Sequence, residues 1–237
     1  MTDELFRTDA YLRSCEAEIG RATHDGIVLT RTVFYPEGGG QPGDHGTLEL
    51  SDGRRLSVVD AKKLEDGSIL HVVEGDVSSD LEGLAVEASI DWDRRHRLMR
   101  VHTLLHLLCA VVPEKVTGGA VRDNGSGRLD FDMPEPRFDK EEVDAELNRL
   151  VTEAHPTAAR WITDEELESE PELVRTMSVR PPRGQGRVRL MEIEGVDLQA
   201  CGGTHVANTG EIGPVRVAKV QKKGKMNRRF TLQLTEY

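Results

Sequence analysis

An apolar segment between Asp91 and Pro113 constrains the fold of this chain more than any other part of the sequence. Asp91 or Asp93 can cap a helix there, and Pro113 is expected to end it. The apolar positions of this helix lie on most of its sides: Leu98, Val101, Leu105, Leu108 and Val112. A helix that is apolar on most sides has to be covered by protein. The sequence therefore predicts a central, buried helix.

The residues before position 91 have the pattern of short strands separated by turns. Apolar and polar residues alternate from 84 to 90, which is the period of a half-buried strand. Further strands are expected over 26–34, 54–60 and 68–73. Asp52-Gly53 and Asp66-Gly67 are typical of hairpin turns. This part of the chain is expected to form a small antiparallel barrel or sandwich.

After the buried helix, the sequence predicts a mixture of helices and strands. Asp139 can cap a helix that continues to Glu153, and a short helix is expected to begin at Thr163 or Asp164. Strands are expected over 157–162, 187–193, 215–221 and 228–234. We therefore predict an α+β fold with two domains, a β-domain over residues 1–90 and a mixed α+β domain over residues 91–237.

Charge is distributed unevenly along the chain. The net charge of −11 argues against broad, non-specific affinity for nucleic acid. Residues 175–237 nevertheless carry a net charge of +7, and residues 1–174 carry −18. The basic residues of the C-terminal part form two clusters, one with Arg180, Arg183, Arg187 and Arg189 and the other with Lys219, Lys222, Lys223, Lys225, Arg228 and Arg229. The second cluster is the better candidate for contacts with a phosphate backbone, and a solvated hairpin face is the alternative.

The sequence also indicates where the protein acts. Its apolar stretches are far shorter than the roughly 20 residues that cross a bilayer, and the acidic N-terminus does not resemble a secretory signal. Three widely spaced cysteines, Cys15, Cys109 and Cys201, suit a reducing compartment better than a disulfide framework. We therefore expect a cytoplasmic protein with no membrane partner.

Two pairs of potential metal ligands stand far apart in the sequence. His102 and His106 are four residues apart on the predicted buried helix, so both imidazoles lie on one face. Cys201-Gly-Gly-Thr-His205 provides a thiolate and a third imidazole, with glycines that permit a tight loop. Histidines on a buried aliphatic helix lose solvation unless something binds them. One sulfur and three nitrogen donors suit Zn²⁺, so we predict a zinc site at these four residues.

Each ligand pair has an ordinary alternative. Histidines four apart on a helix are more often packing or surface residues than metal ligands. Cys109 lies on the same helical face, three residues after His106, and is an alternative sulfur ligand. Free cysteine is also a common core residue, and we favour Cys201.

A glycine-rich segment, Pro36-Glu-Gly-Gly-Gly-Gln-Pro-Gly-Asp44, is the third motif. Together with His102-x-x-x-His106 and Cys201-Gly-Gly-Thr-His205, it resembles the editing region of alanyl-tRNA synthetases. The chain resembles the freestanding alanyl-tRNA editing proteins of the AlaX family from about residue 11 to residue 230, including the segments 128–132 and 208–213. The glycine-rich segment is similar to that of the medium-sized form, which has an N-terminal β-barrel.

This resemblance implies an activity, a cofactor and a partner. The reaction would be hydrolysis of the ester that links a wrong amino acid, serine or glycine, to the 3′ end of tRNA(Ala). The residues that match the family's zinc ligands, and that we also take as the catalytic set, are His102, His106, Cys201 and His205. Editing would take place in trans on mischarged tRNA(Ala), without use of ATP, and the basic C-terminal cluster would contact the tRNA.

Accepting serine while rejecting alanine requires a polar group that bonds the serine hydroxyl. Thr117, just after the buried helix, is one candidate, and Gln41 and Asp44 in the glycine-rich segment are others. The three glycines, Gly38, Gly39 and Gly40, are expected to close over the ester as a hinge. An ordinary turn residue at Thr117 and a closely packed backbone at the glycines are the alternatives.

Two other functions stay open from the sequence. A zinc-stabilised RNA-binding module would have the same ligands and the same basic hairpin but no turnover. A zinc hydrolase of small metabolites is disfavoured, because His102 and His106 enclose Thr103-Leu104-Leu105 and not the glutamate of a His-Glu-x-x-His motif.

Overall fold

The computed structural model describes residues 2–174 and 186–235. The chain forms two compact units, Met1–Arg97 and Leu98–Tyr237. Helix α1 (Trp92–Val111) begins in the first unit and continues into the second. None of the helices in the described ranges has the length and apolarity that crossing a bilayer requires.

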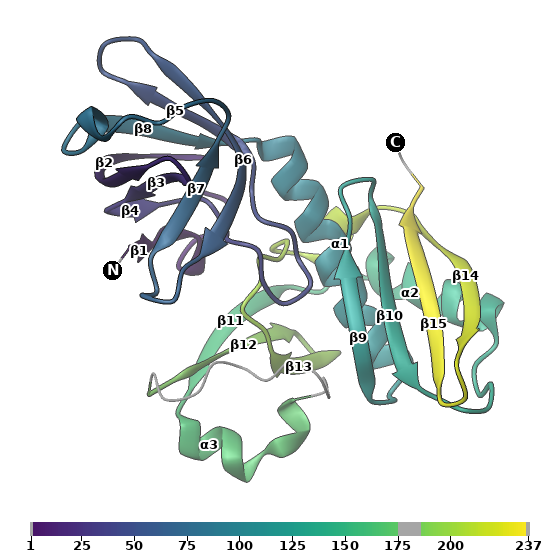
Figure 1. The fold of residues 1–237 in the computed structure, drawn as a ribbon. Helices are drawn as coiled ribbons and strands as arrows, with labels where there is room; N and C mark the ends of the chain where they lie inside the picture. Colours follow the sequence, from purple (N-terminus) through teal and green to yellow (C-terminus); the bar gives the residue numbers. More distant parts are fainter. Residues whose placement is uncertain (1, 175–185, 236–237) are drawn as a thin grey trace. The chain divides into compact units, whose positions relative to one another are not determined.

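The first unit contains a closed antiparallel barrel with the strand order β2-β3-β7-β6-β5-β8 (Figure 1). Its strands are β2 (Ser14–Thr23), β3 (Gly26–Leu29), β5 (Gly46–Leu50), β6 (Arg55–Lys63), β7 (Ile69–Val73) and β8 (Ala85–Ile90). Short strands β1 (Asp3–Glu4) and β4 (Arg31–Thr32) pair with each other in parallel. Fully buried aliphatic side chains fill the unit, among them Ile19, Ile27, Leu48 and Ile69. The predicted barrel is thus confirmed, although the strand expected over 26–34 is divided into β3 and β4.

The glycine-rich segment of the first unit is an ordered turn. Gly38 and Gln41 exchange two backbone hydrogen bonds of 3.0 and 2.9 Å, and the Tyr35 hydroxyl donates to the Gly38 carbonyl at 2.9 Å. Gly39 and Gly40 between them have φ values of +58° and +81°. A two-residue turn with positive φ at both central positions strongly favours glycine. The backbone conformation therefore explains the glycines at 39 and 40.

Asp44 forms a buried ion pair with Arg95 in the first turn of α1. Arg95 is 0% exposed and Asp44 is 1% exposed. Nε of Arg95 lies 2.9 Å from both carboxylate oxygens, and Nη2 also donates to Asp44. Arg95 donates further to the carbonyls of Ala10 and Val33, and Asp44 accepts from the Tyr35 N–H. This network connects three segments of the first unit to the start of α1.

His71 of β7 is a buried, neutral imidazole in the first unit. Its Nδ1 lies 2.9 Å from the Ile27 carbonyl and its Nε2 lies 2.8 Å from the Thr32 hydroxyl. The carbonyl accepts only, so Nδ1 carries the proton and Nε2 accepts from Thr32. Burial disfavours the charged ring and lowers the pKa of His71 to about 4, although the Ile27 carbonyl opposes this shift.

We expect the first unit to lose stability as the pH falls from about 6.5 to about 4. In this window the unfolded state binds a proton at His71, whose ordinary pKa is about 6.5, and the folded state does not. The loss should total roughly 3 kcal/mol, at about 1.4 kcal/mol per pH unit. Urea unfolding of wild type and His71→Gln at several pH values would measure it. The free energy of unfolding of His71→Gln should depend less on pH than that of wild type. Replacement of the exposed His24 should leave the pH dependence unchanged. Equal slopes in all three proteins would contradict this assignment.

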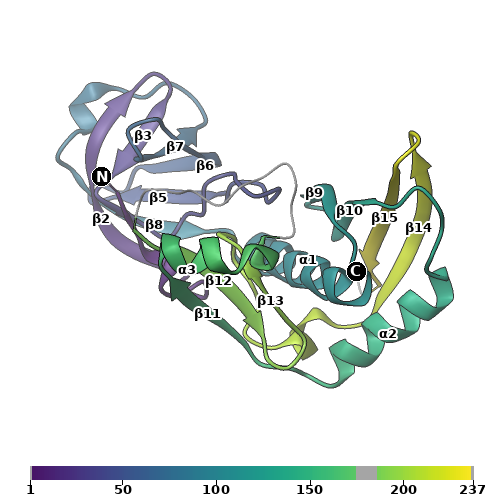
Figure 2. The ribbon, with the colours of Figure 1, turned by 90° about the horizontal axis from the view of Figure 1, so that it is seen from below.

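The second unit is built around α1, which lies between two antiparallel sheets of that unit (Figures 1 and 2). One sheet has the order β14-β15-β10-β9 and the other β11-β12-β13. Residues 101–109 of α1 are all buried, as predicted for a central helix, and Asp91 caps it by accepting from the Arg94 N–H at 3.1 Å. A Cβ on Gly127 of β10 would lie 2.7 Å from Val101. Glycine at that position therefore allows close packing of the sheet on α1.

The strands of the four-stranded sheet are β9 (Val116–Val121), β10 (Ser126–Asp132), β14 (Val215–Lys223) and β15 (Asn227–Leu234). Those of the three-stranded sheet are β11 (Thr157–Ile162), β12 (Val188–Ile193) and β13 (Asp197–Ala200). Helix α2 (Lys140–Thr152) is capped by Asp139, and α3 (Asp164–Ser169) begins with a capping box at Thr163 and Glu166. The cap at Asp139 and the start of α3 match the sequence predictions.

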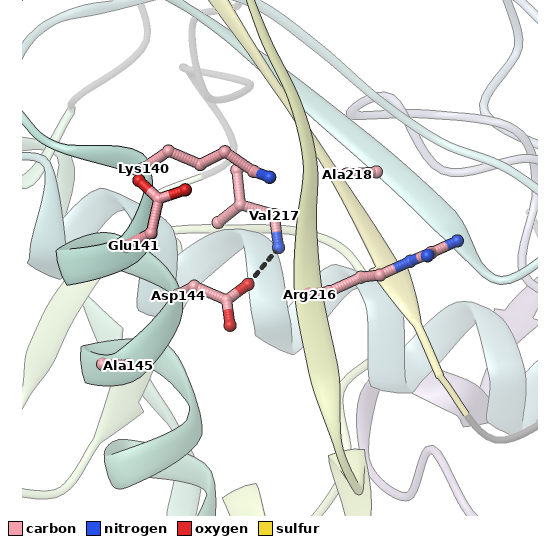
Figure 3. A pocket seen from close by; sticks show the side chains of 7 residues that line it. All are labelled: Lys140, Glu141, Asp144, Ala145, Arg216, Val217 and Ala218. Atoms are coloured by element: carbon pink, nitrogen blue, oxygen red, sulfur yellow. Dashed lines mark hydrogen bonds between the residues drawn. The ribbon is translucent and has the colours of Figure 1, made fainter.

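Helix α2 covers the beginning of β14, which is an edge strand. Asn148 accepts from the Val215 N–H and donates to the Val215 carbonyl, and Asp144 accepts from the Val217 N–H. Figure 3 shows the Asp144 carboxylate pointing to that N–H inside a pocket between α2 and β14. The pocket is lined by Lys140, Glu141, Asp144, Ala145, Arg216, Val217 and Ala218. Since Asp144 and Asn148 satisfy backbone groups of this edge strand, we assign the pocket to the structure of the sheet.

Candidate metal centre

One cysteine and three histidines converge in the second unit. The ligand atoms of His102, His106, Cys201 and His205 all lie within 4.8 Å of one another. Cys201 Sγ is 3.6 Å from His102 Nε2 and 3.3 Å from His205 Nε2. The histidines are each at most 6% exposed. The structure thus brings together side chains from the middle of α1 and from the loop after β13, as the sequence predicted.

Thr103 orients the imidazole of His205. Its hydroxyl lies 3.0 Å from the Met99 carbonyl, which can only accept, and it accepts from the Val206 N–H at 3.2 Å. The same hydroxyl is 3.2 Å from His205 Nδ1. With its own proton directed to Met99, the Thr103 hydroxyl accepts a hydrogen bond from the Nδ1–H of His205. This leaves the lone pair of Nε2 directed towards Cys201, as a metal ligand requires.

Asp197 at the start of β13 orients His106, as Thr103 orients His205. Its Oδ2 lies 3.5 Å from His106 Nδ1, and both side chains are at most 7% exposed. Gln199 donates to the same carboxylate oxygen. A carboxylate behind a histidine favours the proton on the nearer nitrogen and directs the other nitrogen to a metal.

The loop that carries Cys201 is held by backbone and side-chain donors. The Gly203 N–H points to Cys201 Sγ at 3.4 Å. Arg189 Nη1 donates to the carbonyls of Cys201 and Gly203 at 2.9 and 3.0 Å. These contacts hold the loop in the conformation that places Cys201 Sγ next to His102 and His205.

The pKa values of the cluster favour a thiolate at Cys201 and a neutral imidazole at His205. Burial opposes a thiolate at Cys201, but the three neighbouring imidazoles outweigh burial and hold the pKa of the thiol well below its usual range. Burial lowers the pKa of His205 well below its usual range. Burial also disfavours charge on His106, yet Cys201 and Asp197 raise its pKa to about 9. A thiolate and a neutral imidazole are the forms that bind metal, so Cys201 and His205 are in the binding form, and a metal ion would replace the proton that the thiolate and Asp197 stabilise on His106.

Cys201, and not Cys109, belongs to the group of ligands found among the described residues. Cys109 is buried on α1 at 5% exposure. Of the two sulfurs that the sequence left open, the structure therefore groups Cys201 with the three histidines.

The structure places the predicted selectivity residues in both units. Thr117 lies on β9 of the second unit and donates to the Asp130 carbonyl at 3.1 Å. Gln41 and Asp44 belong to the first unit and are 0% and 1% exposed. Since the Asp44 carboxylate is bound by Arg95, we assign Asp44 to the structure of its own unit. Gly38, Gly39 and Gly40 form the ordered turn described above.

The basic C-terminal cluster divides into bound and exposed side chains. Arg229 forms a two-pronged ion pair with Asp130 at 2.6 and 2.7 Å, and Arg228 donates to the Pro134 carbonyl. Lys219, Lys222, Lys223 and Lys225 are exposed on the β14–β15 hairpin. In the other basic cluster, Arg180 and Arg183 lie outside the described residues. The four lysines of the hairpin are therefore exposed to solvent, whereas its two arginines are bound to other protein groups.

Three residues that orient the ligands were not predicted from the sequence: Thr103, Asp197 and Arg189. Thr103 had a detectable signal, because it is a polar residue between two histidines on an otherwise aliphatic helix. Asp197 had a weaker signal, since residues four apart in a strand share a face and Asp197 precedes Cys201 by four. Arg189 had none, because its partners are known only from the pairing of β12 with β13.

Two family models match parts of the chain. Residues 188–231 match the second additional domain of threonyl- and alanyl-tRNA synthetases. Residues 9–94 match the class II (A) tRNA synthetases. The first match covers Cys201 and His205, and the second covers most of the barrel unit.

Relatives that align with this chain over almost their whole length are named alanyl-tRNA editing proteins. The chain is 40% identical to an alanyl-tRNA editing protein AlaX-M of Methanosarcina acetivorans, over 98% of this chain and 99% of the relative. It is 35% identical to the AlaX-M of Saccharolobus solfataricus, over 97% of each. It is also 37% identical to an alanine–tRNA ligase of Metallosphaera sedula, over 93% of this chain but 25% of the ligase. End-to-end similarity to AlaX-M proteins, together with the converging histidines and cysteine, shows that this chain belongs to the AlaX-M family of alanyl-tRNA editing proteins.

Proposed function

We propose that this protein hydrolyses the ester bond between tRNA(Ala) and a wrongly attached serine or glycine, in trans and with zinc. The observation that carries the proposal is the buried cluster of one cysteine and three histidines in a chain that aligns end to end with alanyl-tRNA editing proteins. The ester is more reactive than an amide. The site therefore has mainly to position the ester and an attacking water molecule and to stabilise the negative charge that develops on the carbonyl oxygen.

His102, His106, Cys201 and His205 fit Zn²⁺ through their chemistry. They provide three nitrogens and one sulfur within 4.8 Å of one another, and the low pKa of Cys201 favours the thiolate that zinc binds. Zinc, when bound, would supply positive charge next to the ester carbonyl. Thr103 and Asp197 keep the imidazoles in the tautomers that ligation requires.

We expect Asp197→Asn to weaken zinc affinity about 10- to 100-fold, because loss of a carboxylate behind a ligating histidine has an effect of this size. Competition with a chromophoric chelator would measure the change. Glu194→Gln, an exposed carboxylate on the same part of the chain, is the matched control. Equal zinc affinity in the two variants would remove Asp197 from the site.

Selection of serine needs a polar group that a methyl side chain leaves unsatisfied. Of the three candidates, Gln41 and Asp44 are fully buried, and Thr117 is half-buried on β9. We therefore propose Thr117 as the residue that bonds the serine hydroxyl. Thr117→Val, which keeps the shape and removes the hydroxyl, should lower the preference for seryl over alanyl ester.

The exposed lysines of the β14–β15 hairpin are the proposed contact for the tRNA backbone. Replacing Lys222, Lys223 and Lys225 with glutamine should weaken tRNA binding and reduce the slope of log affinity against log salt by about 2 to 3, at roughly 0.7–0.9 per lost phosphate contact. Filter binding at several salt concentrations would measure both. Lys115 and Lys140, exposed elsewhere in the second unit, provide a control pair, and an unchanged slope in the hairpin variant would exclude this contact.

The function itself is tested by incubating the protein with seryl-, glycyl- and alanyl-tRNA(Ala), with zinc removed and then restored. Loss of the seryl and glycyl esters, only in the zinc form, is expected. The alternative is a zinc-stabilised tRNA-binding module. It is supported by the number of ligands, because structural zinc sites have four protein ligands and leave no coordination position open for water or substrate. Zinc-dependent binding with no deacylation would favour that module.

A further inference from the structure

Trp161 lies on β11, the edge strand of the three-stranded sheet (Figure 1). Its side chain is 43% exposed, and the only other large exposed hydrophobic residues in the described ranges are Leu12 and Met226. Exposure of one aromatic residue alone requires no explanation. The position of Trp161 relative to the metal ligands, in contrast, suggests a role for this side chain.

Strand pairing places Trp161 in one row with Cys201. Trp161 lies directly opposite Arg189 in the β11–β12 pair. On the other side of β12, the Cys201 N–H donates to the Arg189 carbonyl at 3.1 Å. Residues opposite each other on neighbouring strands point to the same face. Two strand spacings of about 4.8 Å therefore separate Trp161 from Cys201, which is about 10 Å between their Cα atoms.

The packing of the sheet supports this assignment of faces. The face with the alternate residues Val188 and Leu190 packs in a hydrophobic core with Leu167 of α3. Asp197, on the face of Cys201, points to His106. The indole of Trp161 thus belongs to the metal-centre face of the sheet, at its open edge.

Arg187 adds a positive charge to this position. Its guanidinium carbon lies 4.8 Å from the centroid of the Trp161 ring, and the side chain is exposed. An aromatic ring next to an arginine is the combination that binds single-stranded nucleic acid, in which the ring stacks on a base and the cation contacts the phosphate. The distance of about 10 Å from Cys201 is comparable to the length of one nucleoside.

We propose that Trp161 stacks on the base of the 3′-terminal adenosine of tRNA, with Arg187 next to the adjoining phosphate, and so positions the ester at the metal centre. This inference rests on the proposed function and names a positioning residue for it. The occupant follows from the geometry, because the nucleotide that carries the ester has to end at the cluster. Among the residues that the structure describes, the exposed indole about one nucleoside away offers a platform for its base.

Steady-state deacylation of seryl-tRNA(Ala) tests the positioning role. Trp161→Ala should raise KM about 5- to 150-fold, the range found for loss of a stacked base, with unchanged zinc content. Trp161→Phe should restore most of the loss, because phenylalanine keeps a ring. Leu12→Ala, which removes an exposed hydrophobic side chain from the first unit, is the matched control. A Trp161→Ala variant that behaves like Leu12→Ala would overturn the proposal.

Tryptophan fluorescence gives a test that needs no turnover. The chain has two tryptophans, so Trp92→Phe leaves Trp161 as the only source of tryptophan emission. Titration with an uncharged acceptor-stem minihelix ending in CCA should quench this emission, and a minihelix without the terminal adenosine should quench it far less. Equal quenching by the two minihelices, or none, would overturn the proposal.

The two experiments separate this inference from the proposed function. Quenching by the CCA end without deacylation would contradict the hydrolase function and support the stacking site. Deacylation without quenching would support the function and remove Trp161 from the substrate site.

Discussion

Cys201→Ala is expected to abolish tight zinc binding and to lower the rate of seryl-tRNA(Ala) hydrolysis by more than about 100-fold. Loss of a residue that hydrogen-bonds a metal ligand typically lowers metal affinity or activity about 10- to 100-fold. Cys201 is a direct ligand in the proposed site, so its loss should have a larger effect. Its sulfur lies 3.6 and 3.3 Å from two imidazole nitrogens. No other described side chain in the cluster can replace the thiolate charge.

Zinc content by atomic absorption and single-turnover deacylation would measure the two effects. Cys109→Ala is the matched control, because it removes a buried thiol from α1 outside the ligand group. It should retain zinc and activity. Loss of zinc in Cys109→Ala but not in Cys201→Ala would show that the wrong sulfur was assigned.

Asp44→Ala is expected to destabilise the first unit by about 3–5 kcal/mol, because it leaves the Arg95 guanidinium buried without its counter-charge. Arg95 is 0% exposed and cannot reach water without a rearrangement of its surroundings. Denaturant unfolding would measure the loss. Asp60→Ala, which removes a partly exposed carboxylate from the same unit, provides the comparison.

The double variant Asp44→Leu, Arg95→Met separates the cost of an unpaired charge from the loss of the pair itself. Replacing both members of a buried pair with apolar residues is often close to neutral, so much of the stability should return. If Asp44→Ala unfolds like Asp60→Ala, the ion pair does not have the role that we assign to it.

Helix boundaries were predictable from the sequence because their signals are local. The central helix was expected from Asp91 or Asp93 to Val112 and is observed over Trp92–Val111. The cap at Asp139 and the strand over Thr157–Ile162 were also predicted correctly. In each case the residues that set the boundary are neighbours in the sequence.

Strands β9 and β10 were not predicted because their glycines are explained by packing against residues that are distant in the sequence. β9 contains Gly118 and Gly119, and a Cβ on Gly119 would lie 2.7 Å from Leu129 of β10. Gly127 of β10 is required by Val101 and Leu105 of α1. Glycine weakens the sequence signal of a strand, although here it permits close packing.

The ligands of the metal centre were predictable from residue type, but the role of Asp44 was not. Histidine and cysteine are uncommon on aliphatic or glycine-rich segments, so their presence at His102, His106, Cys201 and His205 was informative. An aspartate in a polar loop fits many roles. Only the partner at Arg95, 51 residues away, showed that Asp44 is structural.

The separation of the ligands along the chain also sets the order in which the protein can mature. His102 and Cys201 are 99 positions apart, so during synthesis the helical half of the centre emerges long before the sulfur does. Contacts of such long range form late in folding. A nascent chain would therefore expose His102 without its thiolate partner while the next 99 positions are synthesised, and metal capture would mark the end of folding in the second unit.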